Sequence, residues 1–180
     1  MHVKTKMMAF GGLLLALFVL CMALGSVFET GTLFFLAAGS YFVGIVIREM
    51  GMKMGVAFYL AAVLLGVILA PNKFYVLTFA AMGFYITAVE GMWRLLAKGP
   101  GKVQRRGIFF GMKFVLFNLM YIPLVVFFQE ILFSQKLSGG MAAAVLIGGQ
   151  ILLWIYDNAY EYFQGHVWPG FRGRLFKIKD

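Results

Sequence analysis

MMAFGGLLLALFVLCMALGSV, residues 7–27, is the stretch of sequence that decides the fold class of this chain. It carries no charged side chain, and its length of about 21 residues lets a helix cross a hydrocarbon layer of roughly 30 Å. Lys4 and Lys6 precede it, as basic residues precede the apolar part of a secretory signal, but no convincing small-residue cleavage site follows. We therefore expect this stretch to be the first membrane-spanning helix.

The composition extends this interpretation to the whole chain. Of the 180 residues, 62% are hydrophobic and 13% are charged, and the mean hydropathy is +0.89. The apolar blocks are continuous, without the alternation typical of barrel strands, and in lipid only a helix satisfies its own backbone groups. We predict an all-α polytopic membrane protein that forms a single transmembrane domain over residues 1–180, with a basic cytoplasmic tail at 164–180. The six predicted spans cover about 7–27, 31–47, 54–70, 74–93, 108–128 and 141–163.

The distribution of Lys and Arg predicts the orientation. The predicted loops on the opposite side contain only Lys73 and Lys136, and Lys113 falls within the fifth span. Cytoplasmic loops carry the excess of positive charge, so we predict that both termini are cytoplasmic. The 13 basic residues assigned to the cytoplasmic face are Lys4, Lys6, Arg48, Lys53, Arg94, Lys98, Lys102, Arg105, Arg106, Arg172, Arg174, Lys177 and Lys179.

Motifs typical of enzymes and metal sites are absent from the sequence. It has no HExxH, CxxC, GxSxG or P-loop pattern, and His2 and His166 lie near opposite ends of the chain. We predict no cofactor, no metal and no enzymatic activity, and we expect no nucleic-acid partner because the net charge of +9 follows membrane topology. An intramembrane enzyme would require Asp157, Glu161 and His166 to converge in a cleft.

Four ionisable residues, Glu90, Lys113, Asp157 and Glu161, fall within the predicted spans, where a charge calls for a partner. Glu90 and Lys113 are predicted at similar depth on antiparallel neighbours, while Asp157 and Glu161 lie one turn apart on one helix face. We expect Lys113 to pair with Glu90 or with Asp157. This charge cluster either holds the helices together or forms a coupling surface for a partner protein on the cytoplasmic side.

The loops predicted to face the exterior contain polar and aromatic residues. Aromatic side chains with a few convergent polar groups suit a small-molecule pocket, although the same aromatic residues are also typical of the belt at a membrane interface. On the first interpretation, we predict that a small-molecule ligand binds near Glu29, Asn72, Tyr75 and Gln129.

Small residues in the first span predict a contact with another membrane protein. Ala9, Gly12 and Ala16 are spaced so that they share one helix face, where small side chains allow a second helix to approach closely. We predict that these three residues form a partner interface.

The whole chain resembles the S components, the substrate-capturing membrane subunits of energy-coupling factor transporters, and bacterial membrane proteins related to them. The resemblance is carried by the Lys-rich start before Ala9-Phe10-Gly11-Gly12-Leu13-Leu14-Leu15-Ala16, by Gly51 to Gly55 through Leu69 to Lys73, by Phe117-Asn118-Leu119 and by Tyr156 to Tyr160 before a basic end. Gly12 replaces the first alanine of the family's alanine-x-x-x-alanine docking motif.

This resemblance implies a multi-pass protein of the bacterial plasma membrane. It further implies a six-helix fold with a ligand pocket on the external side, capped by the first loop. It also implies two kinds of partner, a transmembrane coupling subunit and ATPase subunits, so that the chain would take part in uptake of a vitamin or other micronutrient. The alternative is an accessory or scaffold protein that transports nothing and binds another membrane protein or anionic lipid headgroups through its basic segments.

Overall fold

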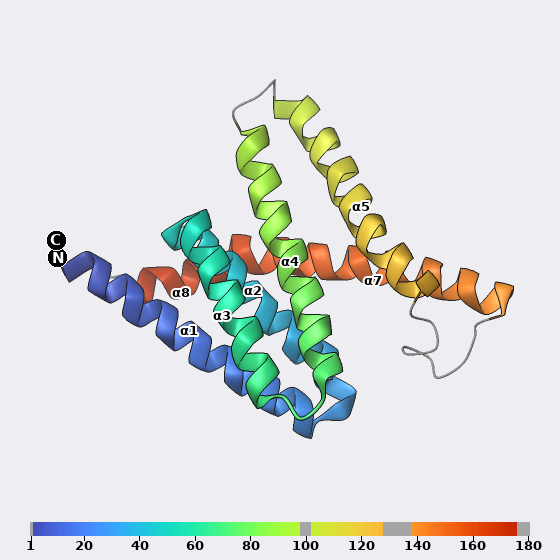
Figure 1. Ribbon diagram of the computed structural model, residues 1–180. Coiled ribbons are helices and arrows are strands. Elements are labelled where there is room, and N and C mark those ends of the chain that lie inside the picture. The colour runs from blue at the N-terminus through green and yellow to red at the C-terminus, as the bar shows by residue number, and fades with distance from the viewer. Residues whose placement is uncertain (1, 98–101, 128–137, 176–180) are drawn as a thin grey trace. The chain divides into compact units, whose positions relative to one another are not determined.

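A computed structural model describes residues 2–97, 102–127 and 138–175, and throughout these residues the regular structure is helical. Figure 1 shows the course of the helices along the chain. Their bounds are α1 His2–Val27, the short 3₁₀ turn η1 Glu29–Gly31, α2 Thr32–Met50, α3 Met52–Leu69, α4 Lys73–Leu96, α5 Lys102–Phe127, α7 Gly139–Tyr162, the π-helical segment η2 Phe163–Val167 and α8 Trp168–Leu175.

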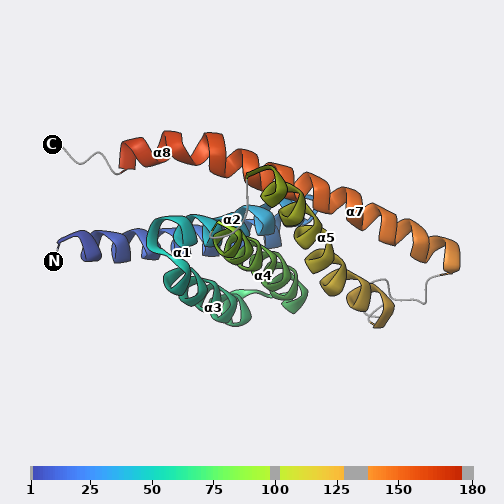
Figure 2. The same ribbon diagram turned by 90° about the horizontal axis from the view of Figure 1, so that it is seen from above.

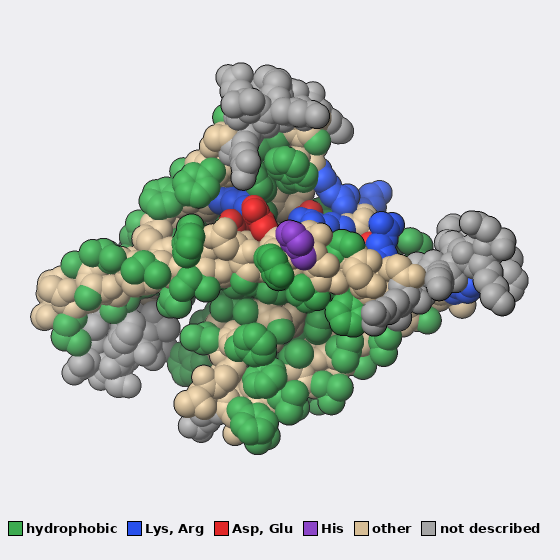
Figure 3. All heavy atoms as spheres, turned by 180° about the vertical axis from the view of Figure 1, so that it is seen from behind, with side chains coloured by type: hydrophobic (Ala, Val, Ile, Leu, Met, Phe, Trp, Pro, Cys, Tyr) green, Lys and Arg blue, Asp and Glu red, His purple; other side chains and the backbone are tan. Residues whose placement is uncertain are grey.

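Among the described residues, six helical stretches are long and apolar enough to cross a membrane, which confirms the fold class predicted from the sequence. Each contains one predicted span almost entirely, and most extend beyond it by a turn or less. Many apolar side chains remain on the outside of these helices; Ile68 is 76% exposed and Leu119 is 72% exposed. Figure 3 shows hydrophobic side chains over much of the described surface that it presents, as expected of helices surrounded by lipid.

The last helix continues beyond its predicted end. Span six was predicted to end at Phe163 and to be followed by a tail, but the helical backbone continues through η2 and α8 to Leu175. Pro169 does not stop it, because this proline lies in the first turn of α8, where its fixed φ and missing N–H are tolerated. The wider turns of η2 directly before α8 change the hydrogen-bond register of the helix.

The chain divides into two compact units, Met1–Phe109 and Phe110–Asp180, which we call the N-terminal and C-terminal units. In the N-terminal unit α2 contacts α1, α3 and α4, and α3 also contacts α1 and α4. Figures 1 and 2 show these four helices as one group. Half of the α2 span is buried, compared with 22% of the α1 and α3 spans, so α2 is the central helix of this unit.

The inner face of α1 follows a simple spacing. Phe10, Leu14, Phe18 and Met22 recur every four residues and are buried, so they form one stripe along the helix. The rings of Phe18 and Phe79 lie 4.3 Å apart between centroids, which fixes α1 against the centre of the unit. The outer face of α1 is formed by residues between these positions.

The contact between α2 and α3 depends on Gly55. This residue is buried, and a Cβ added to it would collide with the Ile47 side chain and lie only 3.1 Å from the Ile47 Cα. Gly51 connects the two helices in a conformation with φ of +93°, in the region that favours glycine. Glycine at both positions therefore allows two consecutive helices to turn sharply and then pack closely.

We expect Gly55→Ala to destabilise the N-terminal unit, although alanine is the better helix former by about 1 kcal/mol. The added methyl group would force Ile47 and α3 apart, at an expected net loss of about 1–3 kcal/mol. Circular dichroism during denaturant unfolding in detergent micelles measures the difference. The matched control is Gly12→Ala, where an added Cβ meets no atom within 4 Å and stability should stay equal or rise. Equal unfolding midpoints for both variants would contradict the close approach.

Candidate functional site

In the described part of the N-terminal unit, an ion pair with a buried carboxylate joins α2 to α4. The Arg48 guanidinium lies 2.6 Å from Glu90 Oε1, and the side chain of Glu90 is 5% exposed while that of Arg48 is 39% exposed. Arg48 Nε also donates a hydrogen bond to Glu90 Oε1 over 2.7 Å. From the sequence, Glu90 was one of two partners considered for Lys113. Arg48 was not foreseen as a partner of Glu90, because the predicted second span ended at Ile47.

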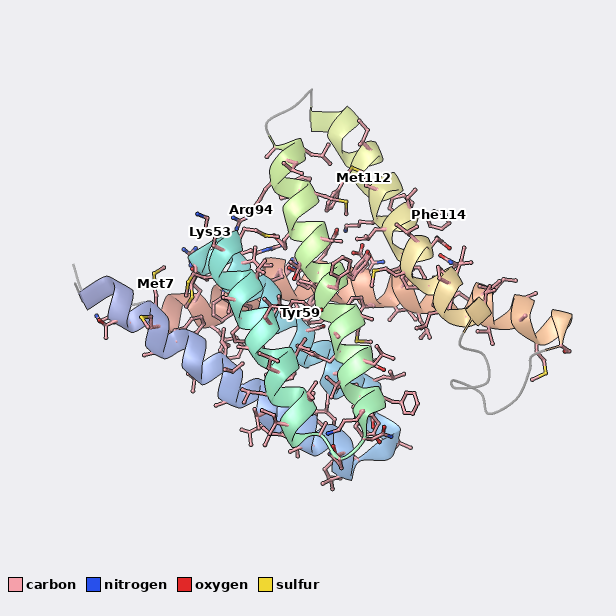
Figure 4. All side chains as sticks on the ribbon, viewed as in Figure 1. Met7, Lys53, Tyr59, Arg94, Met112 and Phe114 are labelled. Atoms are coloured by element: carbon pink, nitrogen blue, oxygen red, sulfur yellow. The ribbon has the colours of Figure 1, made fainter. Side chains whose placement is uncertain are left out.

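Basic side chains gather at one end of the N-terminal unit. Arg94 donates a hydrogen bond to the carbonyl oxygen of Ile47, near the end of α2, and it lies at the same end as Lys53 (Figure 4). A cation at the carbonyl end of a helix is favoured by the helix dipole. The connections α1–α2 and α3–α4 lie at the other end of this unit (Figure 1), so Lys73 is separated from Lys53 by the length of α3.

The C-terminal unit contains a second charged cluster. Lys113 on α5 donates a hydrogen bond of 2.8 Å to Asp157 and another to Glu161, both on α7. Its side chain is 6% exposed, compared with 17% for Asp157 and 56% for Glu161. Asp157 is one of the two partners that the sequence analysis considered for Lys113. The structure therefore brings three of the four predicted cluster residues together.

Two further polar contacts join α5 and α7. Gln150 donates to Asn118 Oδ1 over 2.8 Å, and the Tyr121 hydroxyl donates to the carbonyl oxygen of Val145 over 2.7 Å. Residues later in α5 bind residues earlier in α7, so the two helices run antiparallel. Gly149 is buried against the Tyr121 ring, which occupies the space that a Cβ would need. Polar side chains thus join α5 to α7 at several levels.

Of the four predicted pocket residues, the structure describes the side chains of Asn72 and Tyr75. Asn72 accepts a hydrogen bond from the backbone N–H of Phe74 over 2.9 Å, so it acts as the N-cap of α4. Tyr75 is half-buried in the first turn of that helix. Gln129 and the side chain of Glu29 lie outside the described parts of the chain. The proposed roles of these four residues in ligand binding stay predictions.

The predicted partner residues occupy the outer face of α1. Ala9, Gly12 and Ala16 are exposed, opposite the buried stripe that contains Leu14 and Phe18. A Cβ on Gly12 would meet no atom within 4 Å, so this face is open to a neighbouring helix. The side chains at these positions therefore project little from the outer surface of α1.

A hollow between α1 and α3 was not foreseen from the sequence. We call it the α1–α3 groove; its volume is about 350 Å³, and it lies near the C-terminal ends of both helices. The residues that line it are mostly apolar, and in the sequence they cannot be distinguished from other residues of membrane-spanning helices. They are Phe18, Val19, Met22, Ala23, Ser26, Gly66, Leu69, Ala70 and Pro71.

The structure describes a contact for each of the three residues that an intramembrane enzyme would require. Asp157 and Glu161 bind Lys113, whereas the ring of His166 stacks on Tyr162 with a centroid distance of 4.7 Å. Within the part of the chain that the structure describes, no group of three or more His, Cys, Asp and Glu residues is placed to hold a metal ion.

Comparisons with protein-family models, with curated proteins and with solved structures gave no match to this chain.

The different exposure of the two carboxylates predicts different effects on stability. Asp157→Asn should lower the free energy of unfolding by about 1–3 kcal/mol, because it removes a charge-assisted hydrogen bond from the buried Lys113. Glu161→Gln should lower it by less than about 1 kcal/mol, because water or lipid headgroups reach this more exposed side chain. Denaturant unfolding of the two variants in the same detergent measures both values. Equal losses would contradict the geometry of the cluster.

Proposed function

We propose that this chain is a substrate-binding membrane subunit of an energy-coupling-factor-type transporter that takes up a vitamin or other micronutrient into a bacterium. The observation that carries the proposal is the outer face of α1, where Ala9, Gly12 and Ala16 are exposed and Gly12 has open space beside it. A transmembrane coupling subunit would pack a helix against this face, since small side chains permit close approach. ATPase subunits would supply the energy.

In this mechanism the subunit binds its solute from outside and reorients when the coupling subunit changes shape. A ligand shifts such an equilibrium only by its different affinities for the two states. The solute would bind near Asn72 and Tyr75, at the end of the N-terminal unit opposite the basic residues Lys53 and Arg94. The charge cluster of Lys113, Asp157 and Glu161 would hold α5 and α7 together as the subunit moves.

Gly12→Leu should weaken the complex with the coupling subunit by about tenfold, because a large side chain keeps the partner helix at a distance. The measurement is the amount of ATPase and membrane subunit that co-purifies with the tagged chain from the membranes of its own host. Gly111→Leu is the matched control, because Gly111 is also an exposed glycine with open space around its Cβ position. If both variants retain the same amount of complex, the proposed interface is wrong.

The proposed orientation has its own test in intact cells. In a Cys21→Ala background, Lys73→Cys should react with a membrane-impermeant maleimide, while Lys53→Cys should react only after permeabilisation. Both lysines are exposed and lie at opposite ends of the same helical group. A difference in their labelling therefore reports the side of the membrane on which each one lies. The reverse pattern of labelling would place both termini outside and would remove the proposed entry side for the solute.

The second candidate function is a membrane scaffold that transports nothing. It is favoured by the exposed basic residues Lys53 and Arg94 at one end of the N-terminal unit, which suit anionic headgroups. Mass spectrometry of small molecules released from the purified protein separates the two candidates. Release of a vitamin-like compound supports uptake, whereas isolation with a non-transport enzyme and release of phospholipid alone supports the scaffold.

A further inference from the structure

We propose that the α1–α3 groove is a binding site for one anionic phospholipid of the surrounding bilayer, with an acyl chain in the groove and the phosphate on Lys73. The evidence for this lipid site does not depend on the solute site proposed above, although Lys73 lies between Asn72 and Tyr75 in the sequence. The argument rests on the lining of the groove, on its depth in the membrane and on the cation at its end.

The lining of the groove suits a hydrocarbon chain. Phe18, Met22, Gly66 and Leu69 present apolar surface, and the hydroxyl of Ser26 is already bonded to the carbonyl oxygen of Met22 over 3.0 Å. An occupant would therefore find no polar side chain in the lining that needs a partner. Side chains that line an empty hollow lack dispersion contacts on that side, and an acyl chain in the hollow would supply these contacts.

The surroundings of the groove indicate that its occupant comes from the bilayer. Leu20 and Leu24 on α1 are exposed beside it, as are Val67 and Ile68 on α3. The groove thus opens between two faces that lipid would cover in a membrane. A phospholipid of the bilayer would already be in contact with these faces.

The dimensions of the groove fit a chain that lies along the helices. On α1 the lining runs from Phe18 to Ser26, which corresponds to about 12 Å at a rise of 1.5 Å per residue. One leaflet of a bilayer is about 15 Å deep in hydrocarbon, half of the total of roughly 30 Å. The groove ends at Ala70 and Pro71, where the helices end and the headgroup region would begin.

Lys73 supplies the charge that would select the headgroup. Its ammonium donates hydrogen bonds to the carbonyl oxygens of Val67 over 2.6 Å and of Ala70 over 3.0 Å, and Ala70 is part of the groove lining. An ammonium carries three N–H groups, so a donor remains beyond these two bonds for a phosphate oxygen. Lys73 is also the first residue of α4, where the helix dipole favours an anion.

Native mass spectrometry of the full chain tests the site after extraction from nanodiscs that contain phosphatidylglycerol and phosphatidylcholine. We expect the wild-type chain to retain one phosphatidylglycerol preferentially. Lys73→Gln should lower the ratio of phosphatidylglycerol to phosphatidylcholine by about fivefold, the factor for about 1 kcal/mol per cation near a membrane surface. Lys73→Arg should keep the ratio, and Lys6→Gln, on an exposed part of α1 outside the groove lining, should leave it unchanged.

Ala23→Phe tests the groove itself, because its ring would fill the hollow; Ala57→Phe, on an exposed part of α3 outside the lining, is the control. Thermal unfolding in the same nanodiscs verifies that both variants fold. The proposal predicts that only Ala23→Phe loses the retained lipid. It is overturned if both variants retain the lipid alike, if Lys73→Gln and Lys6→Gln behave alike, or if a co-purifying protein or second copy, rather than lipid, is lost with Ala23→Phe.

Discussion

Hydrocarbon offers no hydrogen-bond partner to a peptide group, and this constraint determines most of what the structure contains. Each span of this chain satisfies its own backbone within a helix, and every described stretch that is long enough to cross a membrane is helical. What remains to be satisfied is a small set of side chains. Glu90, Lys113 and the pair of Asn118 and Gln150 find their partners on neighbouring helices.

The two units use different means to bring helices together. In the N-terminal unit, α2 and α3 approach closely because Gly55 gives Ile47 the room that a larger residue would take. In the C-terminal unit, long polar side chains such as Lys113 and Tyr121 reach from α5 to α7. Close packing of small residues and hydrogen bonding between helices are both known ways to associate helices when lipid tails are as apolar as the helix surfaces.

The fold class could be predicted from the sequence because long uninterrupted apolar segments indicate that hydrocarbon surrounds the helices. The pairing of Lys113 with Asp157 could be anticipated as one of two possibilities, since a charge at this depth calls for a partner. Arg48 as the partner of Glu90 was missed, because a residue placed at the end of a span was treated as a loop residue. The continuation of the last helix past Phe163 was missed because the residues after it were interpreted as a basic tail. Pro169 is tolerated there in the first turn of α8.

The candidate site was predicted less well, for a physical reason. A groove forms where the side chains of two helices fail to fill the space between them, and the sequence of one helix carries no information about the neighbour that it meets. Met22 and Gly66 belong to different spans, and nothing in either segment indicates that they line the same hollow. Asn72, in contrast, has a polar side chain that attracted a functional interpretation, although its amide oxygen caps α4.

The link between Lys113 and Asp157 has a consequence for the order of events during biosynthesis. The carboxylate lies 44 residues after the ammonium that it neutralises, so α5 leaves the ribosome well before its counter-ion exists. A lysine at the centre of a spanning helix is unfavourable by about 3 kcal/mol on insertion scales, and less so near the end of a span, where its side chain reaches toward water. Lys113 lies near the beginning of the predicted fifth span, and its bond to Asp157 forms only after α7 has been synthesised.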